Sequence, residues 1–161
     1  MAITQAMATS FKVDLLDGIH AFGTTVVRAS TAADTFKIAL YTSSASLDAA
    51  TTAYTAPADP AADPTSTNEV SETGTAYDAG GKVLTVSQVP TSTGTTAWLD
   101  FADVTWSAAT ISAAGALIYN SSQSNKAVAV LSFAGTKTST AGDFTIIFPA
   151  ADSTSAIIRI A

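Results

Sequence analysis

The sequence lacks most of the residues with which proteins build reactive sites. It contains no cysteine and a single histidine, His20. Without thiols the chain can form neither a disulfide nor a thiolate metal site, and one histidine offers little for a zinc site or a catalytic triad. We therefore expect a structural or surface role for His20, no metal, no cofactor and no enzymatic activity.

Charge is also scarce and one-sided. Charged residues make up 12% of the chain, and thirteen Asp and Glu against seven Lys and Arg give a net charge of −6. The cations are scattered, so no basic stripe exists for a phosphate backbone or an anionic lipid surface, and we expect binding to neither nucleic acid nor membrane. Long apolar runs and a signal peptide are missing as well, which predicts a protein made in the cytoplasm.

The chain is rich in small residues and in residues that favour β-strands. Ala, Thr and Ser make up nearly half of its 161 residues, a length that suits one domain, 1–161. The run FKIALY (36–41) alternates Phe, Ile and Leu with other residues, which is the period of a strand. Further short runs follow at spacings near ten residues: KVLTVSQV, TAWLDFADVTW, AAGALIYNSS, KAVAVLSF, DFTIIFP and AIIRIA. This pattern predicts a mainly all-β protein, an antiparallel β-sandwich or jelly-roll-like fold over 36–161.

One segment has a helical period. Ser10 is a suitable cap, Gly23 a suitable end, and four apolar residues between them recur at spacings of four, four and three: Phe11, Leu15, Ile19 and Phe22. The spacing predicts an N-terminal helix over 8–23 with one apolar stripe. So short a helix needs a surface to dock on.

A loop is expected at about 47–66, because Pro, Asp, Ala and Thr dominate there. Asp59 and Asp63 lie in it and are possible calcium ligands, but their spacing does not match an EF-hand. We interpret the segment as an exposed, solvated loop and leave its ion binding open.

The other candidate sites have simpler structural interpretations. Asp100 and Asp103 are a carboxylate pair, as glycosidases use, yet strand-end turn chemistry accounts for them better. Gly80-Gly81-Lys82 is followed by a strand pattern, whereas a phosphate-binding loop requires a helix. Aromatic residues could form a sugar-binding face, but packing is the commoner use of such rings: Trp98, Trp106, Tyr54, Tyr77 and Tyr119.

The order of these segments resembles a family of small virion structural proteins of tailed bacteriophages. The similarity runs over nearly the whole chain except the loop from Pro57 to Pro64, and its most specific parts are TSFKVDLLDGIHAFG and the block from Trp98 to Ser122. The resemblance implies a capsid cement, or decoration, protein on the outer surface of the phage head. It further implies a homotrimer whose partner is the major capsid protein.

On this interpretation seven apolar or aromatic residues are the candidate interaction residues: Phe11, Leu15, Ile19, Phe22, Trp98, Trp106 and Tyr119. The stripe on the expected helix could pack on its own sandwich, line the trimer axis or anchor to the capsid. Two alternatives stay open, namely a tail- or fibre-associated virion protein and a carbohydrate- or receptor-binding β-sandwich module.

Overall fold

The computed structural model describes residues 3–8, 11, 15, 19–22, 33–57 and 67–160. Ten strands lie within these ranges. In chain order they are β1 (Ala6–Met7), β2 (Phe36–Tyr41), β3 (Lys82–Leu84), β4 (Val86–Thr93), β5 (Thr96–Phe101), β6 (Val104–Ala109), β7 (Ser112–Asn120), β8 (Lys126–Thr138), β9 (Gly142–Ile146) and β10 (Ile158–Ile160).

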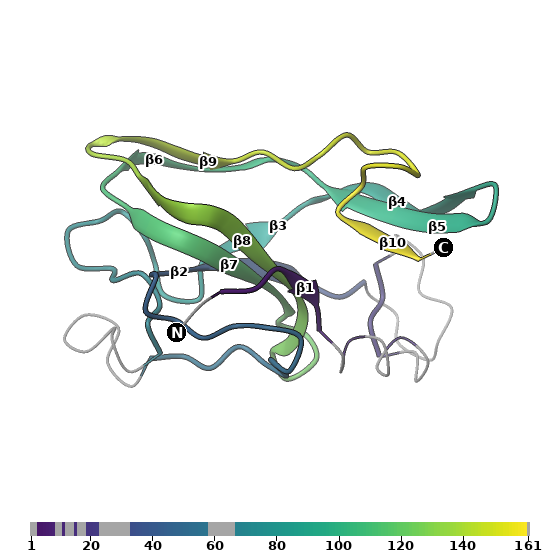
Figure 1. Cartoon of the computed structure of the whole chain (residues 1–161), viewed down its shortest axis with the longest axis horizontal. Coiled ribbons are helices and arrows are strands. Elements are labelled where there is room, and N and C mark those ends of the chain that lie inside the picture. Colours follow the sequence, from purple (N-terminus) through teal and green to yellow (C-terminus); the bar gives the residue numbers. More distant parts are fainter. Residues whose placement is uncertain are drawn as a thin grey trace.

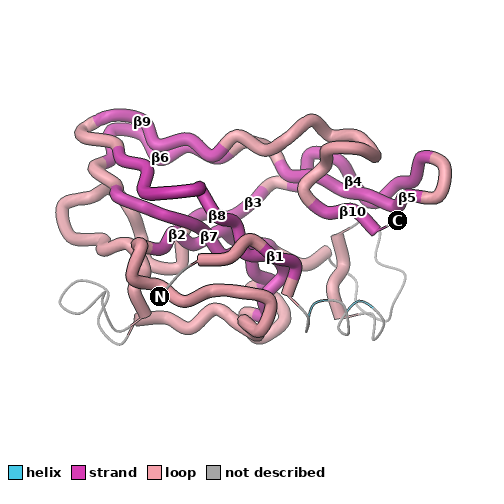
Figure 2. Tube along the Cα trace, viewed as in Figure 1, coloured by secondary structure: helices cyan, strands magenta, loops and turns pink. Residues whose placement is uncertain are grey.

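The strands form three sheets, and every pair is antiparallel. A five-stranded sheet has the order β1-β8-β7-β2-β3, a three-stranded sheet β10-β5-β4, and β6 pairs with β9. In Figure 1 the β6–β9 ribbon runs above the five-stranded sheet, and β4, β5 and β10 lie at the right-hand end. Figure 2 shows the strands and the long loops that join them. The prediction of a mainly all-β, antiparallel fold is confirmed.

The core is built around β7. This strand is hydrogen-bonded to β8 on one edge and to β2 on the other, and every residue from Ala113 to Asn120 is buried. Alternation disappears in such a strand because both of its faces are covered. The three-stranded sheet joins this core through aromatic rings. Phe22 stacks on Phe36 at a centroid distance of 4.2 Å, and Phe36 lies 5.9 Å from Phe101 of β5.

The described elements include no helix, although one was expected over 8–23. Most of that range lies outside the described residues; Phe11 and Leu15 have helical backbone, while Ala8 and 19–22 do not. The Ala21 N–H donates to the Asp34 carboxylate (2.8 Å), and the Asp34 N–H donates to the Ala21 carbonyl (3.2 Å). The extension of the helix through 19–22 is therefore wrong, because this backbone bonds to the segment before β2.

The expected loop at 47–66 is irregular as far as it is described, to residue 57. It is not uniformly exposed, since Leu47 and Tyr54 are buried. The Tyr54 N–H donates to the Asn125 carbonyl at 2.9 Å, which ties the loop to the turn before β8. Asp59 and Asp63 lie outside the described residues.

Gly81 allows the closest backbone contact next to β2. A Cβ atom on this residue would lie 1.8 Å from the Ile38 carbonyl oxygen, and its φ of +68° is left-handed. Gly74 has the same φ of +68° but no atom within 4 Å of the corresponding position. Substituting each glycine by alanine therefore distinguishes the cost of the left-handed backbone conformation, which both share, from the cost of the steric clash with Ile38, which only Gly81 has.

We predict that Gly81→Ala lowers the free energy of unfolding by more than about 3 kcal/mol, since β3 must move away from β2. Gly74→Ala should lower it by only about 1 kcal/mol, the cost of the left-handed conformation alone. Urea denaturation of both variants measures the difference. Equal losses would mean that the contact with Ile38 relaxes at no cost.

Candidate functional site

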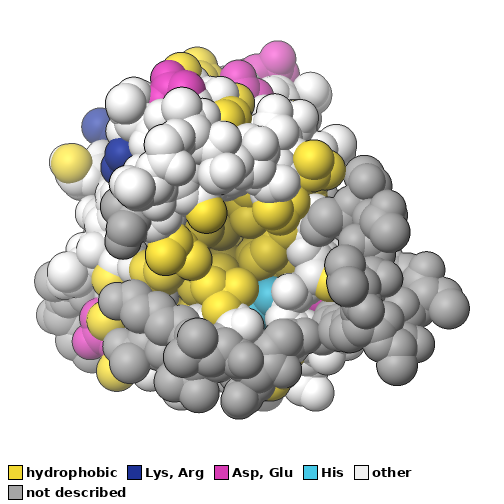
Figure 3. All heavy atoms as spheres, turned by 90° about the vertical axis from the view of Figure 1, so that its right-hand side faces the viewer, with side chains coloured by type: hydrophobic (Ala, Val, Ile, Leu, Met, Phe, Trp, Pro, Cys, Tyr) yellow, Lys and Arg dark blue, Asp and Glu magenta, His cyan; other side chains and the backbone are white. Residues whose placement is uncertain are grey.

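An apolar hollow opens at the end of the molecule that carries the three-stranded sheet (Figure 3). Its volume is about 210 Å³. Its lining comes from the N-terminal segment and from β4, β5 and β10: Phe11, Leu15, His20, Phe22, Pro90, Ala97, Trp98, Leu99, Ile158 and Ile160. Phe11 and Phe22 are buried, whereas Trp98 is half-buried and Ile160 is 51% exposed. The hollow thus has a packed aromatic base and an apolar rim that reaches solvent.

His20 lies in the lining of this hollow, where Figure 3 shows the single histidine among hydrophobic side chains. Its ring packs 4.8 Å from the ring of Phe11, and its Nδ1 lies 3.0 Å from the Asn120 amide nitrogen. The same amide nitrogen donates to the Asp34 carboxylate at 2.8 Å. Asn120 is the last residue of β7 and fully buried, so this network attaches the N-terminal segment to the central strand.

The hollow brings together four of the seven candidate interaction residues, namely Phe11, Leu15, Phe22 and Trp98. Ile19 is half-buried and does not line it. Trp106 and Tyr119 are 1% and 2% exposed and belong to the core. Their rings are therefore unavailable to a partner in this conformation.

The sugar-binding alternative required aromatic rings on one exposed face, and that face is not formed. Tyr54, Tyr77, Trp106 and Tyr119 are all buried. Of the five rings considered, Trp98 alone is partly open to solvent. Packing, the commoner use of such residues, accounts for the other four.

Glu69 is a buried carboxylate that no sequence pattern indicates. This side chain is 1% exposed and accepts hydrogen bonds from the Tyr77 hydroxyl (2.6 Å), the Gly80 N–H (2.7 Å) and the Tyr54 hydroxyl (3.0 Å). Tyr119 stacks on Tyr54 at 4.5 Å and donates to the Gly80 carbonyl at 2.8 Å. Tyr41 is paired with Glu69 through the backbone, so all four tyrosines of the chain adjoin one carboxylate.

Burial changes the acid–base properties of this cluster. Desolvation raises the pKa of Glu69, opposed by its hydrogen bonds from Tyr77, Gly80 and Tyr54 and by the charge of Lys37. Desolvation together with the nearby Glu69 charge raises the pKa of Tyr119 to about 12. The carboxylate is closed off from solvent and its oxygens already accept three hydrogen bonds. The cluster therefore has a structural role and attaches residues 67–81 to β2 and β7.

Asp100 and Asp103 each bind backbone. Asp100 is buried and its Oδ1 accepts the Phe101 N–H at 2.8 Å; desolvation raises the pKa of its carboxyl group. The Oδ1 of Asp103 accepts the Phe148 N–H at 2.9 Å. These contacts agree with the interpretation as strand-end structure, in which each carboxylate satisfies an amide of the chain.

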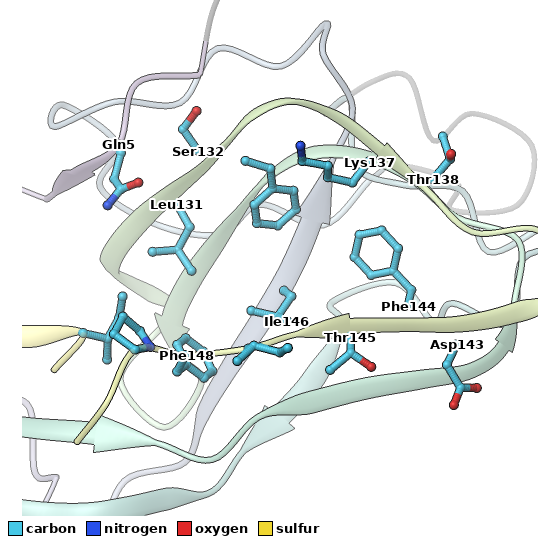
Figure 4. A pocket seen from close by; sticks show the side chains of 14 residues that line it. Gln5, Leu131, Ser132, Lys137, Thr138, Asp143, Phe144, Thr145, Ile146 and Phe148 are labelled. Atoms are coloured by element: carbon cyan, nitrogen blue, oxygen red, sulfur yellow. The ribbon is translucent and has the colours of Figure 1, made fainter. Parts of the chain in front are cut away.

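A second cavity, the β8–β9 groove, lies between those two strands (Figure 4). It has a volume of about 520 Å³, and its lining mixes polar side chains with apolar ones that include Leu131, Phe133, Phe144, Ile146 and Phe148. No sequence signal pointed to it, because it depends on how two strands are spaced across the fold.

Comparison with known proteins gives no relative. No family model matches the chain, and neither the curated proteins nor the solved structures contain a match. Within the described residues, no helix is long and apolar enough to cross a membrane. The same residues contain no group of three or more His, Asp or Glu that could hold a metal ion.

We predict that Glu69→Gln removes a pH dependence of stability. The pKa of Glu69 is raised in the folded state, so folding favours the protonated form. The wild type should therefore lose free energy of unfolding relative to Glu69→Gln as the pH rises from the ordinary Glu pKa, about 4.3, through the raised value. Urea denaturation of both proteins between pH 4 and pH 8 measures this.

Glu72→Gln is the matched control, since it removes the same charge from the same loop at a side chain that is half-buried. Its stability should follow the wild type across the pH range. Glu69→Ala should cost about 2–4 kcal/mol at every pH, because three buried donors lose their acceptor. If the free energy of unfolding of Glu69→Gln changes with pH as that of the wild type does, the Glu69 carboxylate is not desolvated and is hydrated in the folded protein.

Proposed function

We propose that this protein is a structural component of a tailed-phage virion, a trimeric capsid cement protein that bridges major capsid protein subunits on the outer surface of the head. The observation that carries the proposal is the apolar hollow, which gathers Phe11, Leu15, Phe22 and Trp98 at one end of the molecule. These residues lie in the segments whose sequence resembles such proteins most specifically.

The hollow has the properties of a contact surface for another protein. Its rim contains Pro90, Ala97 and Ile160, all exposed, and among the residues that the structure describes no charged side chain belongs to its lining. Exposed apolar surface of this kind is costly in water and is typical of protein interaction sites. A cement protein works by burying such surface against the shell, and binding to the assembled state alone stabilises that state by mass action.

Multiplicity strengthens such an interaction. Three weak contacts linked in one trimer bind together, because the second and third contacts form at a high effective concentration. A hollow of modest size on each copy is therefore sufficient. The same logic applies to a tail or fibre position, and electron microscopy of labelled protein in intact particles distinguishes head from tail.

We predict that Ile160→Asp at the rim of the hollow weakens association with phage heads at least tenfold, because it places an unpaired charge in the contact. Val83→Asp is the control, since Val83 is 59% exposed on β3 and does not line the hollow. Co-sedimentation of each purified variant with heads that lack the protein measures binding. Light scattering checks for the trimer.

Heads that bind neither the wild type nor Val83→Asp would refute the cement role. Equal binding by both variants and the wild type would place the shell contact away from the hollow.

A further inference from the structure

The β8–β9 groove is bounded by two strand edges that have no partner among the described residues. On the β8 side, β1 pairs with Ala129 and Val130 and then departs, with Thr4 donating to the Leu47 carbonyl at 3.0 Å. The Val128 carbonyl accepts the Ala8 N–H at 3.2 Å, so the backbone of Val128 points toward β1. By strand alternation the N–H and carbonyl of Ser132 point the same way, beyond the end of β1 and toward the groove.

The β9 edge faces the groove from the other side. In the described chain β9 pairs with β6 and with no other strand. The groove is lined by consecutive residues, 131–133 from β8 and 143–149 from β9 and the segment after it. Successive side chains of a strand point to opposite faces of the sheet. A groove that is lined by consecutive residues therefore runs along the edge of the strand and not over one face. Figure 4 shows apolar side chains from both strands directed into the space between them.

These features specify the chemistry of an occupant. Two open edges require an extended polypeptide, which can pair its own N–H and carbonyl groups with them. The lining combines apolar side chains with uncharged Gln, Ser and Thr side chains, and the charges of Lys137 and Asp143 cancel, so an uncharged strand fits best. Because the site is concave it cannot pair with a copy of itself, and a contact between two copies must use a different, protruding element.

The chain carries such an element at its opposite end. Strands β4 and β5 form a hairpin that pairs up to Thr93 and Thr96 and extends away from the five-stranded sheet (Figure 1). Residues 86–98 contain no charged side chain, and every side chain from Val89 to Thr93 is exposed. The outer edge of β4 has no partner strand in the described chain. Pro90 and the irregular pairing lie nearer the base, so the regular tip at 91–93 is the part able to pair.

We propose that the β4–β5 hairpin of one copy inserts its tip into the β8–β9 groove of the next copy. A donor on one surface and an acceptor on another make a heterologous contact, and three such contacts close a ring. This inference rests on the trimer in the proposed function and assigns its interface. The tip at 91–93 pairs with 96–98, and Pro90, Ala97 and Trp98 of the same hairpin line the apolar hollow, so the two contacts are adjacent on the hairpin.

Disulfide trapping tests the contact, because the chain has no cysteine of its own. The double variant Ser92→Cys/Ser132→Cys places one thiol on the hairpin tip and one at the groove. Disulfides form only when the two Cα atoms come within about 4.4–6.8 Å. Mild oxidation should give a covalent trimer on a non-reducing gel, which returns to the monomer on reduction.

The control is Ser92→Cys/Ser124→Cys, which moves the second thiol to an exposed position in the turn before β8. It should stay monomeric on the gel, as should each single variant. A trimer by light scattering that gives no cross-link in the first pair, or gives dimers only, would overturn the proposed interface. Cross-linking of the control as readily as the first pair would do the same.

A backbone variant tests the hydrogen-bonding edge itself. Ser132→Pro removes the N–H that faces the groove, whereas Ser132→Thr keeps it. We expect self-association about tenfold weaker for the proline variant than for the threonine variant, the cost of one backbone hydrogen bond. Circular dichroism checks that both are folded. If the proline variant is unfolded, the cross-linking result decides.

The outcomes separate the two proposals. A monomer that still co-sediments with phage heads overturns the hairpin–groove contact and leaves the cement role. A cross-linked trimer that does not bind heads supports the contact and overturns the cement role.

Discussion

The placement of β7 between β8 and β2 is the constraint on which the rest of the structure depends. Its residues from Ala113 to Asn120 are all buried, so both of its faces must be covered, and Figure 1 shows the β6–β9 ribbon above the sheet. Small residues make this possible. At Gly115 a Cβ atom would lie 2.5 Å from the Leu131 carbonyl oxygen and 2.9 Å from the Ile3 side chain, so β8 and the N-terminal arm approach more closely than alanine allows. The abundance of Ala and Gly in β7 thus has a packing reason.

Strand positions could be predicted because their signal is local. The run 36–41 alternates in sequence and is β2 in the structure, and AAGALIYNSS contains most of β7. The extent of the N-terminal helix was harder to predict, because apolar residues of its stripe are buried by tertiary contacts. Phe11 and Phe22 of that stripe are buried, but the Ala21 N–H donates to the Asp34 carboxylate and the His20 ring contacts the Asn120 amide, and both contacts join residues far apart in sequence.

The sites depend on the same long-range information. Glu69, Tyr54, Tyr77 and Tyr119 are separated by up to 65 residues, and nothing in their sequence spacing relates them. The β8–β9 groove arises because β1 leaves the edge of β8 after two residues and β9 pairs on one side. Register and strand ends determine both features, and single-sequence patterns carry little information about either. By contrast the sequence predicts Phe11, Leu15, Phe22 and Trp98 as interaction residues, and the structure brings all four to one hollow.

The tyrosine cluster gives the protein a built-in optical marker. Burial and the neighbouring carboxylate raise the pKa of every tyrosine in the chain, and all four adjoin Glu69. Their phenols therefore stay neutral in alkali at which an exposed tyrosine ionises. Tyrosinate absorbance in the ordinary range consequently comes from molecules in which the cluster has opened, and it follows the loosening of 67–81 from the central sheet without an added label.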